Sequence, residues 1–306
     1  MTMGVGGKAG PTLAEAKGAT GSVTFCAGKD LTGDHRDAVK SFNAKFSAQG
    51  LKAQLLEFPE SADEQRNQFI QRQEARSDDC DVFYSDVIWT AEFASQQWLY
   101  DLTDYVKRRR SEFVPSTLET IEFEDRFFGV PKQTDAGFLY YRTDKVDQVP
   151  ETWQGVYQEA ARSGGIVYQG AAYEGLTVDF LELAFAAGGQ VLSEDGNTSM
   201  IDSPENLEAL EFMVGGIRSG AAPKAVTTYM EEQARRAFEA GRATFMRNWP
   251  YAFSLGSKAP KVKGRFAVAP FPAFEGGGKA GSSVVTTPSS RSSRRIRTGP
   301  CSSSTT

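Results

Sequence analysis

Three short apolar segments separated by two amphipathic helices most strongly constrain how this 306-residue chain folds. Residues 23–26, 51–58 and 81–85 read as strands, whereas residues 35–46 and 62–76 have helical periodicity. This β-α-β-α-β order predicts a parallel sheet with right-handed crossovers, and a ligand cleft at the carboxyl ends of the strands. The predicted fold class is therefore α/β.

A second α/β unit is predicted after an extended crossing segment. Residues 123–130 read as a small hairpin and residues 130–135 as the crossing segment. Two α/β lobes joined in this way favour a ligand pocket between the lobes that closes by a hinge. The predicted strands of the second unit are 138–141, 166–168, 243–246 and 266–269. One predicted helix begins at Pro150, and three more cover residues 176–187, 204–219 and 229–240.

Composition excludes several classes of function. The formal net charge of −5 argues against a nucleic-acid partner. A single histidine, His35, and three cysteines rule out a histidine- or cysteine-rich zinc site, so we expect neither a metal nor a cofactor. No apolar run approaches the roughly 20 residues that span a bilayer. His35 itself is expected to be a surface residue of the first helix.

The cysteines Cys26 and Cys80 are expected to be separate buried thiols. Cys26 ends the first predicted strand, whereas Cys80 begins the third. In a parallel sheet these positions lie at opposite strand ends, more than about 10 Å apart at roughly 3.3 Å per residue, which is too far for a disulfide.

The two ends of the chain differ from its middle. Residues 1–20 are glycine-rich and contain no apolar segment typical of a secretory signal, so we predict a disordered leader. Residues 282–306 are rich in Ser, Thr and Arg, which predicts a tail without fixed structure. The predicted organisation is a leader over 1–20, a first lobe over 21–132, a second lobe over 133–272, the start of a return to the first lobe over 273–281, and the tail over 282–306.

The genetic code suggests an origin for this tail. Restoring one nucleotide before the codon of Ser282 allows a frame that encodes a strand, an Asn-Pro turn and the start of an amphipathic helix. We hypothesise that a single-base deletion puts the chain out of frame after Gly281. Resequencing of the locus tests this hypothesis.

Several multi-residue blocks resemble one known family over about residues 21–281. The chain is similar to the trehalose/maltose-type extracellular solute-binding proteins (family 1) of ABC sugar importers, especially actinobacterial lipoproteins. Members of this family begin with a signal peptide and a lipid-anchored cysteine and continue well beyond the position of Gly281, and this chain departs from both patterns. The blocks are Asp81-Val82-Phe83, Ser85-Asp86-Val87-Ile88-Trp89, Thr134-Asp135-Ala136-Gly137, Tyr173-Glu174-Gly175-Leu176, Arg247-Asn248-Trp249-Pro250-Tyr251 and Val268-Ala269-Pro270-Phe271-Pro272.

The resemblance implies a two-lobed periplasmic-binding-protein-like fold of type II, truncated at its C-terminus. It implies that a monomer binds a disaccharide or short oligosaccharide of the trehalose/maltose type between its lobes and delivers it to the membrane subunits of an ABC permease. The implied location is the cell surface, as a lipoprotein, although the chain as written lacks a signal peptide.

Two carboxylates and two aromatic residues are the main candidates for sugar contacts. Asp86 ends a buried strand and Asp135 lies on the crossing segment, where carboxylates can accept hydrogen bonds from hydroxyls. The alternatives are a helix N-cap for Asp86 and a turn residue for Asp135. Trp249 and Tyr251 flank Pro250 and can present aromatic faces to a sugar, whereas the alternative is ordinary core packing.

Four further residues are weaker candidates for substrate binding. Arg66 offers a planar donor fork, although a helical arginine is often simply solvated. Tyr173 and Glu174 begin a helix of the second lobe, where a glutamate also suits the helix dipole. Asp34 lies in the first strand-to-helix loop.

A binding protein and a glycoside hydrolase are the two functions to separate. We predict a non-enzymatic sugar-binding protein. The alternative is a hydrolase in which Asp86 and Asp135 form the carboxylate pair. Hydrolysis needs a protonated carboxylic acid beside an ionised one, whereas aromatic plates with scattered single acids suit binding.

Overall fold

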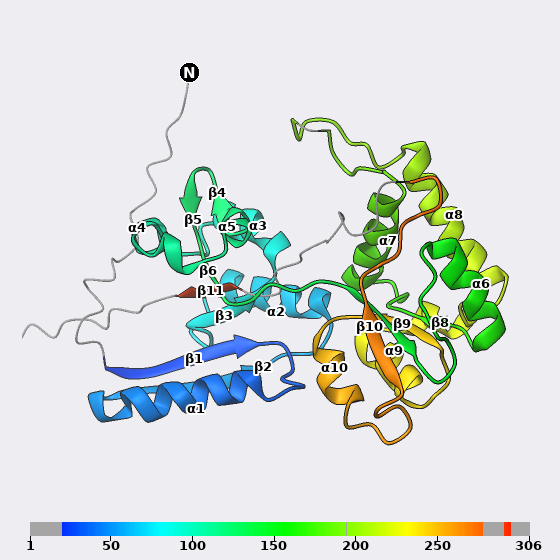
Figure 1. Ribbon diagram of the computed structural model, residues 1–306. Helices are drawn as coiled ribbons and strands as arrows, with labels where there is room; N and C mark the ends of the chain where they lie inside the picture. The colour runs from blue at the N-terminus through cyan, green and yellow to red at the C-terminus, as the bar shows by residue number, and fades with distance from the viewer. Residues whose placement is uncertain (1–19, 194, 278–290, 295–306) are drawn as a thin grey trace, which may run out of the picture. The chain divides into compact units, whose positions relative to one another are not determined.

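The computed structural model describes residues 20–193, 195–277 and 291–294 (Figure 1). These residues form two compact units. Unit 1 runs up to Thr134 and includes Arg291–Arg294, and unit 2 runs from Asp135 to the end of the described segment at residue 277. The predicted lobe boundary after residue 132 lies close to this division. The predicted leader, up to residue 19, lies outside the described residues.

Unit 1 is built on the predicted parallel sheet. Strand β1 (Gly21–Ala27) pairs in parallel with β2 (Leu51–Glu57) on one side and β3 (Val82–Ser85) on the other. Helices α1 (Asp34–Phe46) and α2 (Ala62–Glu74) connect these strands. The β-α-β-α-β prediction is therefore confirmed, with most boundaries shifted by only one or two residues.

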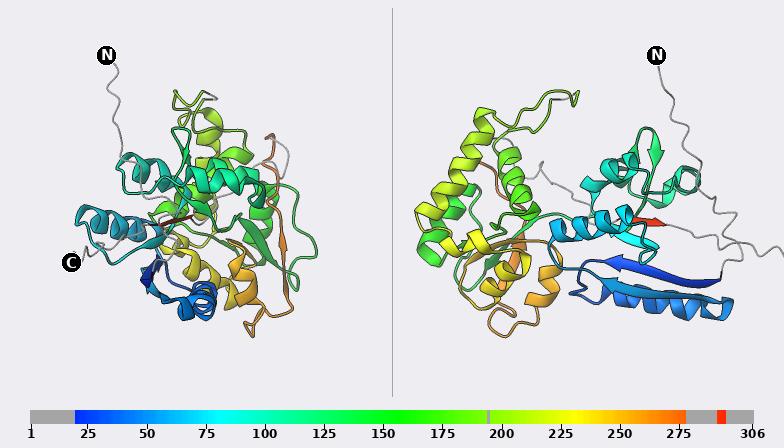
Figure 2. Two further views of the ribbon diagram at one scale, coloured as in Figure 1. Left: turned by 90° about the vertical axis from the view of Figure 1, so that its left-hand side faces the viewer. Right: turned by 180° about the vertical axis from the view of Figure 1, so that it is seen from behind.

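The two faces of this sheet are covered differently. Phe83 of β3 packs against Phe69 of α2, with ring centroids 4.6 Å apart, in the main aromatic core of unit 1. On the opposite face, Phe25 and Tyr84 contact the ring of His35 from α1, which lies along the sheet in Figure 2. The prediction of His35 as a surface residue is therefore only partly right, because its ring packs edge-on against the sheet.

Short elements follow β3, and most of them were not predicted. The first two of them, residues 87–95, add Trp89 and Phe93 to the main aromatic core, whereas the later ones pack around a small core of Val106, Leu118, Ile121 and Phe127. The predicted hairpin over 123–130 is present as two short strands. These elements are η2 (Val87–Trp89), α3 (Thr90–Ser95), α4 (Thr103–Arg108), α5 (Pro115–Glu119), β4 (Glu122–Phe123) and β5 (Arg126–Phe127). Helices of five or six residues are too short to display a helical period, which is why the sequence pattern missed them.

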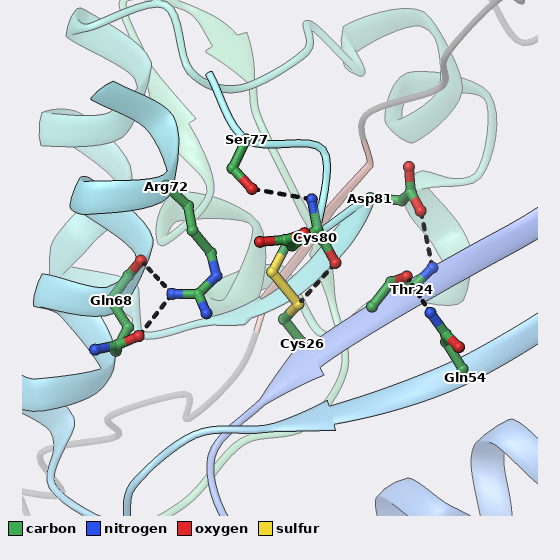
Figure 3. The surroundings of a disulfide bond; sticks show 9 residues. Thr24, Cys26, Gln54, Gln68, Arg72, Ser77, Cys80 and Asp81 are labelled. Atoms are coloured by element: carbon green, nitrogen blue, oxygen red, sulfur yellow. Dashed lines mark hydrogen bonds between the residues drawn. A yellow bond between two sulfur atoms is a disulfide. The ribbon is translucent and has the colours of Figure 1, made fainter. Parts of the chain in front are cut away.

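Cys26 and Cys80 form a disulfide, so the prediction of two separate thiols is wrong (Figure 3). Their Cα atoms lie 5.8 Å apart. The prediction assumed that the chain before β3 continues as a straight strand, but residues 78–81 bend. Asp81 is fixed opposite Thr24 by two hydrogen bonds, and Cys80 turns toward Cys26 instead of continuing along the sheet. The prediction that both side chains are buried is correct.

Asp30 fixes the loop that joins β1 to α1. Its carboxylate accepts hydrogen bonds from the backbone N–H groups of Gly33, at 2.8 Å, and Arg36, at 2.9 Å. Burial disfavours the charged carboxylate, but these backbone hydrogen bonds, together with the charges of His35 and Arg36, outweigh burial and hold the pKa of Asp30 below its ordinary value. The loop therefore depends on an ionised Asp30.

The predicted unstructured tail is contradicted at four residues. Arg291–Arg294 form strand β11, which pairs antiparallel with β3 and with β6 (Val130–Pro131) in the sheet order β2-β1-β3-β11-β6. A sheet edge is completed by backbone N–H and C=O groups, so a segment rich in Ser and Arg can still supply a strand. The other residues of the predicted tail lie outside the described part of the chain.

Unit 2 contains a mixed sheet in the order β10-β7-β9-β8. Strand β7 runs antiparallel to both neighbours, and β8 and β9 run parallel. The predicted strands and helices of this unit are all present. They are β7 (Phe138–Arg142), α6 (Trp153–Ser163), β8 (Ile166–Val167), α7 (Glu174–Ala186), α8 (Pro204–Arg218), α9 (Glu231–Glu239), β9 (Phe245–Asn248) and β10 (Phe266–Ala269); α10 (Tyr251–Gly256) was not predicted.

Helices cover both faces of this sheet. Arg247 of β9 faces α7, where it contacts Glu182. Tyr140 of β7 faces α9, where its ring lies edge-on to Phe238. Phe274 is buried in the same core, so the described residues after 272 still belong to unit 2.

We expect loss of the disulfide to destabilise the protein. The bond closes a loop across a sequence separation of 54 residues, which restricts the unfolded chain. Replacing both cysteines (Cys26→Ala with Cys80→Ala) should lower the free energy of unfolding by about 2–4 kcal/mol in denaturant titrations. Two fewer thiols should titrate in the denatured oxidised chain than after reduction. An unchanged unfolding midpoint after reduction of the unaltered protein would contradict this expectation.

Asp30→Asn should lower stability at neutral pH by about 2 kcal/mol, since a charged acceptor of two backbone hydrogen bonds is lost. The pKa of Asp30 is lowered in the folded state from 3.8. Its stabilising effect is therefore fully present above that value and disappears as the pH falls through the folded-state pKa. The free energies of unfolding of the unaltered protein and of Asp30→Asn should therefore converge as the pH falls, and urea titrations from pH 7 to pH 2 measure this. Asp37→Asn, an exposed aspartate in the first turn of the same helix, is the control and should have little effect.

Candidate functional site

Strand direction brings five predicted site residues to one edge of the unit 2 sheet. β8 and β9 are parallel, so the residues that follow them meet at the same edge. β7 is antiparallel to β9, with Phe138 opposite Asn248, so the residues that precede β7 also reach this edge. The residues gathered here are Asp135 before β7, Tyr173 and Glu174 after β8, and Trp249 and Tyr251 after β9.

Two contacts fix Trp249, one to its ring and one to its backbone carbonyl oxygen. The guanidinium carbon of Arg247 lies 4.0 Å from the centroid of the Trp249 ring, in cation–π contact. The Tyr140 hydroxyl donates a hydrogen bond of 2.7 Å to the Trp249 carbonyl oxygen. Burial raises the pKa of Tyr140 above its ordinary value, so this hydroxyl stays protonated as a donor. Trp249 itself is only partly buried.

Two tyrosines lie against the first turn of α9. The Tyr251 hydroxyl donates to Glu232 Oε1 at 3.0 Å, and Tyr173 lies close to Glu231. Burial, together with these carboxylates, raises the pKa of both tyrosines, so both phenols are neutral at physiological pH. Gly175 makes room for Tyr173, because a Cβ atom at Gly175 would lie 2.1 Å from the Tyr173 hydroxyl oxygen.

The two carboxylates at this edge come from different elements. Asp135 precedes β7 and is partly buried, close enough to Tyr140 to raise the pKa of that hydroxyl further. Glu174 occupies the first turn of α7, as predicted, where a negative charge suits the helix dipole. Both can accept hydrogen bonds from a ligand's hydroxyl groups.

A buried ion cluster around Arg247 lies next to Trp249. Arg247 Nε donates to Glu182 Oε2 at 2.7 Å, and Nη1 donates to Gln169 Oε1 at 2.8 Å; Nη2 donates to Glu182 Oε1. Asp179 Oδ1 lies 2.9 Å from Arg247 Nε, and Asp179 Oδ2 accepts the backbone N–H of Gln169. Burial raises the pKa of Asp179 well above its ordinary value, against the opposing charge of Arg247. The cluster is electrically neutral when Asp179 holds its proton.

In unit 1, Asp34 and Asp86 lie at the carboxyl edge of the parallel sheet. Asp34 begins α1, is exposed and accepts a hydrogen bond from the Thr32 hydroxyl at 2.8 Å. Asp86 follows β3 and accepts the backbone N–H of Ile88 at 3.1 Å, which makes it the N-cap of η2. The capping role considered for Asp86 is therefore confirmed.

Arg66 is held by a carboxylate within unit 1. Its Nε donates to Glu92 Oε2 at 2.8 Å, and its Nη2 donates to Glu92 Oε1. The guanidinium is thus bidentate on Glu92 of α3. This pairing fixes Arg66 at the surface of α2.

A cationic group in unit 1 was missed by the sequence analysis. Lys132 Nζ lies 3.2 Å from His35 Nδ1 and 4.6 Å from the centroid of the Tyr84 ring. Burial and the charge of Lys132 lower the pKa of His35. These residues come from three distant parts of the chain, so no local pattern could have joined them.

The Arg247 cluster was also missed, although a signal was present. An arginine inside the apolar segment 243–248 cannot be buried without a partner. Asp179 and Glu182 are spaced three apart in the otherwise apolar part of α7 that follows Thr177, so both face one side. This combination predicts a buried ion pair, but it does not predict that Trp249 stacks on it.

Neither a metal centre nor a membrane span is found in the part of the chain that the structure describes. No group of three or more His, Cys, Asp or Glu side chains there is placed to hold a metal ion. No helix among those residues combines the length and apolar character needed to cross a bilayer.

Known proteins resemble this chain in sequence, and a solved structure resembles it in both sequence and fold. A probable ABC transporter-binding protein of Deinococcus radiodurans is 32% identical over 275 residues, which cover 84% of this chain and 65% of that protein. A maltotriose-binding protein of Pyrococcus abyssi is 27% identical over 62% of this chain and 41% of its own length. Maltose-bound MalE3 of T. maritima is 36% identical with a TM-score of 0.83, covering 91% of this chain and 73% of that one.

The chain therefore spans about two thirds or less of the length of these curated relatives. Its fold is that of the two-lobed periplasmic sugar-binding proteins, as predicted. Residues 32–292 match the family of bacterial extracellular solute-binding proteins. Together with the identity to the Deinococcus protein, this match means that the chain belongs to the bacterial extracellular solute-binding protein family.

Proposed function

We propose that this protein binds a maltose-type disaccharide or short oligosaccharide and delivers it to the membrane subunits of an ABC importer. The observation that carries the proposal is the gathering of Trp249, Tyr173, Glu174 and Asp135 at one edge of unit 2. Aromatic plates beside single carboxylates are the chemistry that a neutral sugar needs.

Sugar rings have apolar C–H faces and polar rims. Trp249 is a partly exposed residue whose ring is held in place by Arg247, so it offers a fixed apolar surface for one sugar face. Asp135 and Glu174 offer charged acceptors for the hydroxyl groups on the rim. Tyr251 completes this surface as part of the same edge.

The relatives support the ligand class. MalE3 of T. maritima, at 36% identity, binds maltose, and the Pyrococcus abyssi relative is a maltotriose-binding protein. Both ligands are glucose oligomers with the same alternation of apolar faces and polar rims. We therefore place maltose and maltotriose ahead of trehalose as ligands of this chain.

Unit 1 carries further candidate contacts for a sugar. Asp34 and Asp86 lie at the edge to which the parallel strands β1 and β3 point. Capping of η2 orients the Asp86 carboxylate and does not prevent it from accepting a sugar hydroxyl, since a carboxylate has about four lone-pair sites. Arg66 donates to Glu92 through Nε and Nη2, and its guanidinium is the candidate donor to a sugar hydroxyl at the surface of α2.

The protein acts as a binding component and not as an enzyme in this proposal. The related proteins favour this role over the hydrolase alternative, in which Asp86 and Asp135 form a carboxylate pair. The related proteins are binding proteins. A monomer that hands its sugar to permease subunits fits this class.

The disulfide supports a location outside the cytoplasm. Disulfides persist in oxidising compartments and are rare in the cytosol. The buried Cys26–Cys80 bond therefore favours function at the cell surface, and attachment there as a lipoprotein is part of the proposal.

Trp249→Ala should weaken maltose binding by about 2–4 kcal/mol, because a central aromatic anchor is lost. Isothermal titration calorimetry of the full chain with maltose, maltotriose and trehalose measures the effect. The far-UV spectrum should stay unchanged. Unchanged affinity would assign Trp249 to packing alone.

Phe253→Ala is the matched control. Phe253 lies on α10 after Trp249, is 51% exposed and belongs to none of the proposed contacts, so its loss should leave affinity unchanged. Overnight incubation of the unaltered protein with maltose tests the enzyme alternative. Released glucose would contradict the binding-only role, and no binding to any of the three sugars would contradict the proposed function.

A further inference from the structure

We propose that Arg247 is a positioning residue for ligand binding, which fixes both the Trp249 ring and the Asp135–Gly137 segment through its buried ion cluster. This inference rests on the proposed function, because Trp249 and Asp135 are ligand contacts only in that proposal. Arg247 would act without touching the ligand, since its side chain is only 2% exposed.

The first step is that the guanidinium cannot move. Three of its nitrogens donate to two partners, with Glu182 held by Nε and Nη2 and Gln169 held by Nη1. Gln169 is itself tied to the Arg247 carbonyl oxygen through its Nε2 at 3.2 Å. The plane of the guanidinium is therefore set by α7 on one side and by the segment after β8 on the other.

The second step is that this fixed plane lies against Trp249. The guanidinium carbon is 4.0 Å from the ring centroid, a distance at which the flat group stacks on the ring. One face of the indole is thereby occupied by Arg247, which leaves the opposite face to meet a sugar. An ammonium group in place of the guanidinium cannot stack in this way.

The third step links the cluster to Asp135. Gly137 lies so close to it that an added Cβ would be 2.3 Å from Glu182 Oε1 and 2.9 Å from Arg247 Nη2. The backbone two residues after Asp135 therefore rests directly on the ion pair. A side chain at Gly137 would have to displace either this segment or the cluster.

The experiment compares Arg247→Lys with Arg142→Lys in the full chain. Arg142 is also buried, also donates twice to one carboxylate, Asp144, and lies on β7 of the same sheet, but it contacts none of the proposed ligand residues. Arg247→Lys should weaken maltose binding about tenfold or more. Arg142→Lys should leave the affinity unchanged.

A second readout does not require ligand. In protein labelled with 5-fluorotryptophan, the ¹⁹F resonance of Trp249, assigned through Trp249→Phe, should shift or broaden in Arg247→Lys and stay in place in Arg142→Lys. A folded Arg247→Lys protein with unchanged affinity and an unchanged Trp249 resonance would overturn the proposal. Failure of the unaltered chain to bind any sugar would overturn the proposed function and the ligand role of Arg247, while the resonance would still decide whether Arg247 fixes the ring.

Gly137→Ala keeps the test decisive if Arg247→Lys does not fold. It leaves every charge in place but crowds the cluster, so we expect weaker maltose binding and a shifted Trp249 resonance. Gly215→Ala in α8 is the matched control, since nothing lies within 4 Å of a Cβ atom added there. Equal affinities and Trp249 resonances in both glycine variants would overturn the proposal.

Discussion

Burial of the Arg247 charge is the constraint on which the rest of unit 2 depends. A guanidinium removed from water needs hydrogen-bonded partners, and removing one partner of such a pair is costly because the other charge is left uncompensated. Glu182, Asp179 and Gln169 meet that need from α7 and from the segment after β8. The ion cluster thus ties β9, one of the two inner strands of the sheet, to the helix α7, and the Trp249 ring stacks on the Arg247 guanidinium.

Strand direction explains why candidate binding residues collect where they do. In unit 1 the parallel pairing of β1 with β3 brings the loop of Asp34 and the residue Asp86 to the same edge. In unit 2, β8 and β9 are parallel and β7 is antiparallel to β9. The residues that follow β8 and β9 and those that precede β7 therefore lie at one edge of the sheet. Such edges are where α/β proteins bind ligands, which fits a sugar-binding role.

The two wrong predictions share a cause. Both treated an irregular segment as if its local sequence fixed its path. A bend over residues 78–81 brings Cys80 to Cys26, although counting along a straight strand keeps them apart. Arg291–Arg294 join the sheet through backbone pairing, which their polar side chains do not forbid. Tertiary contacts overrode local pattern in each case.

The sequence by itself determined the elements and their order. Periods of two and of 3.6 residues are local properties, so the strands and longer helices were predictable, as were the parallel β1, β2 and β3 and the positions of Tyr173, Glu174 and Trp249 at element ends. Only the tertiary structure decided the partners: Cys80 for Cys26, Glu92 for Arg66, Lys132 for His35, and Arg247 for Trp249. These contacts join residues between 2 and 97 positions apart, and they depend on side-chain directions that no local period encodes.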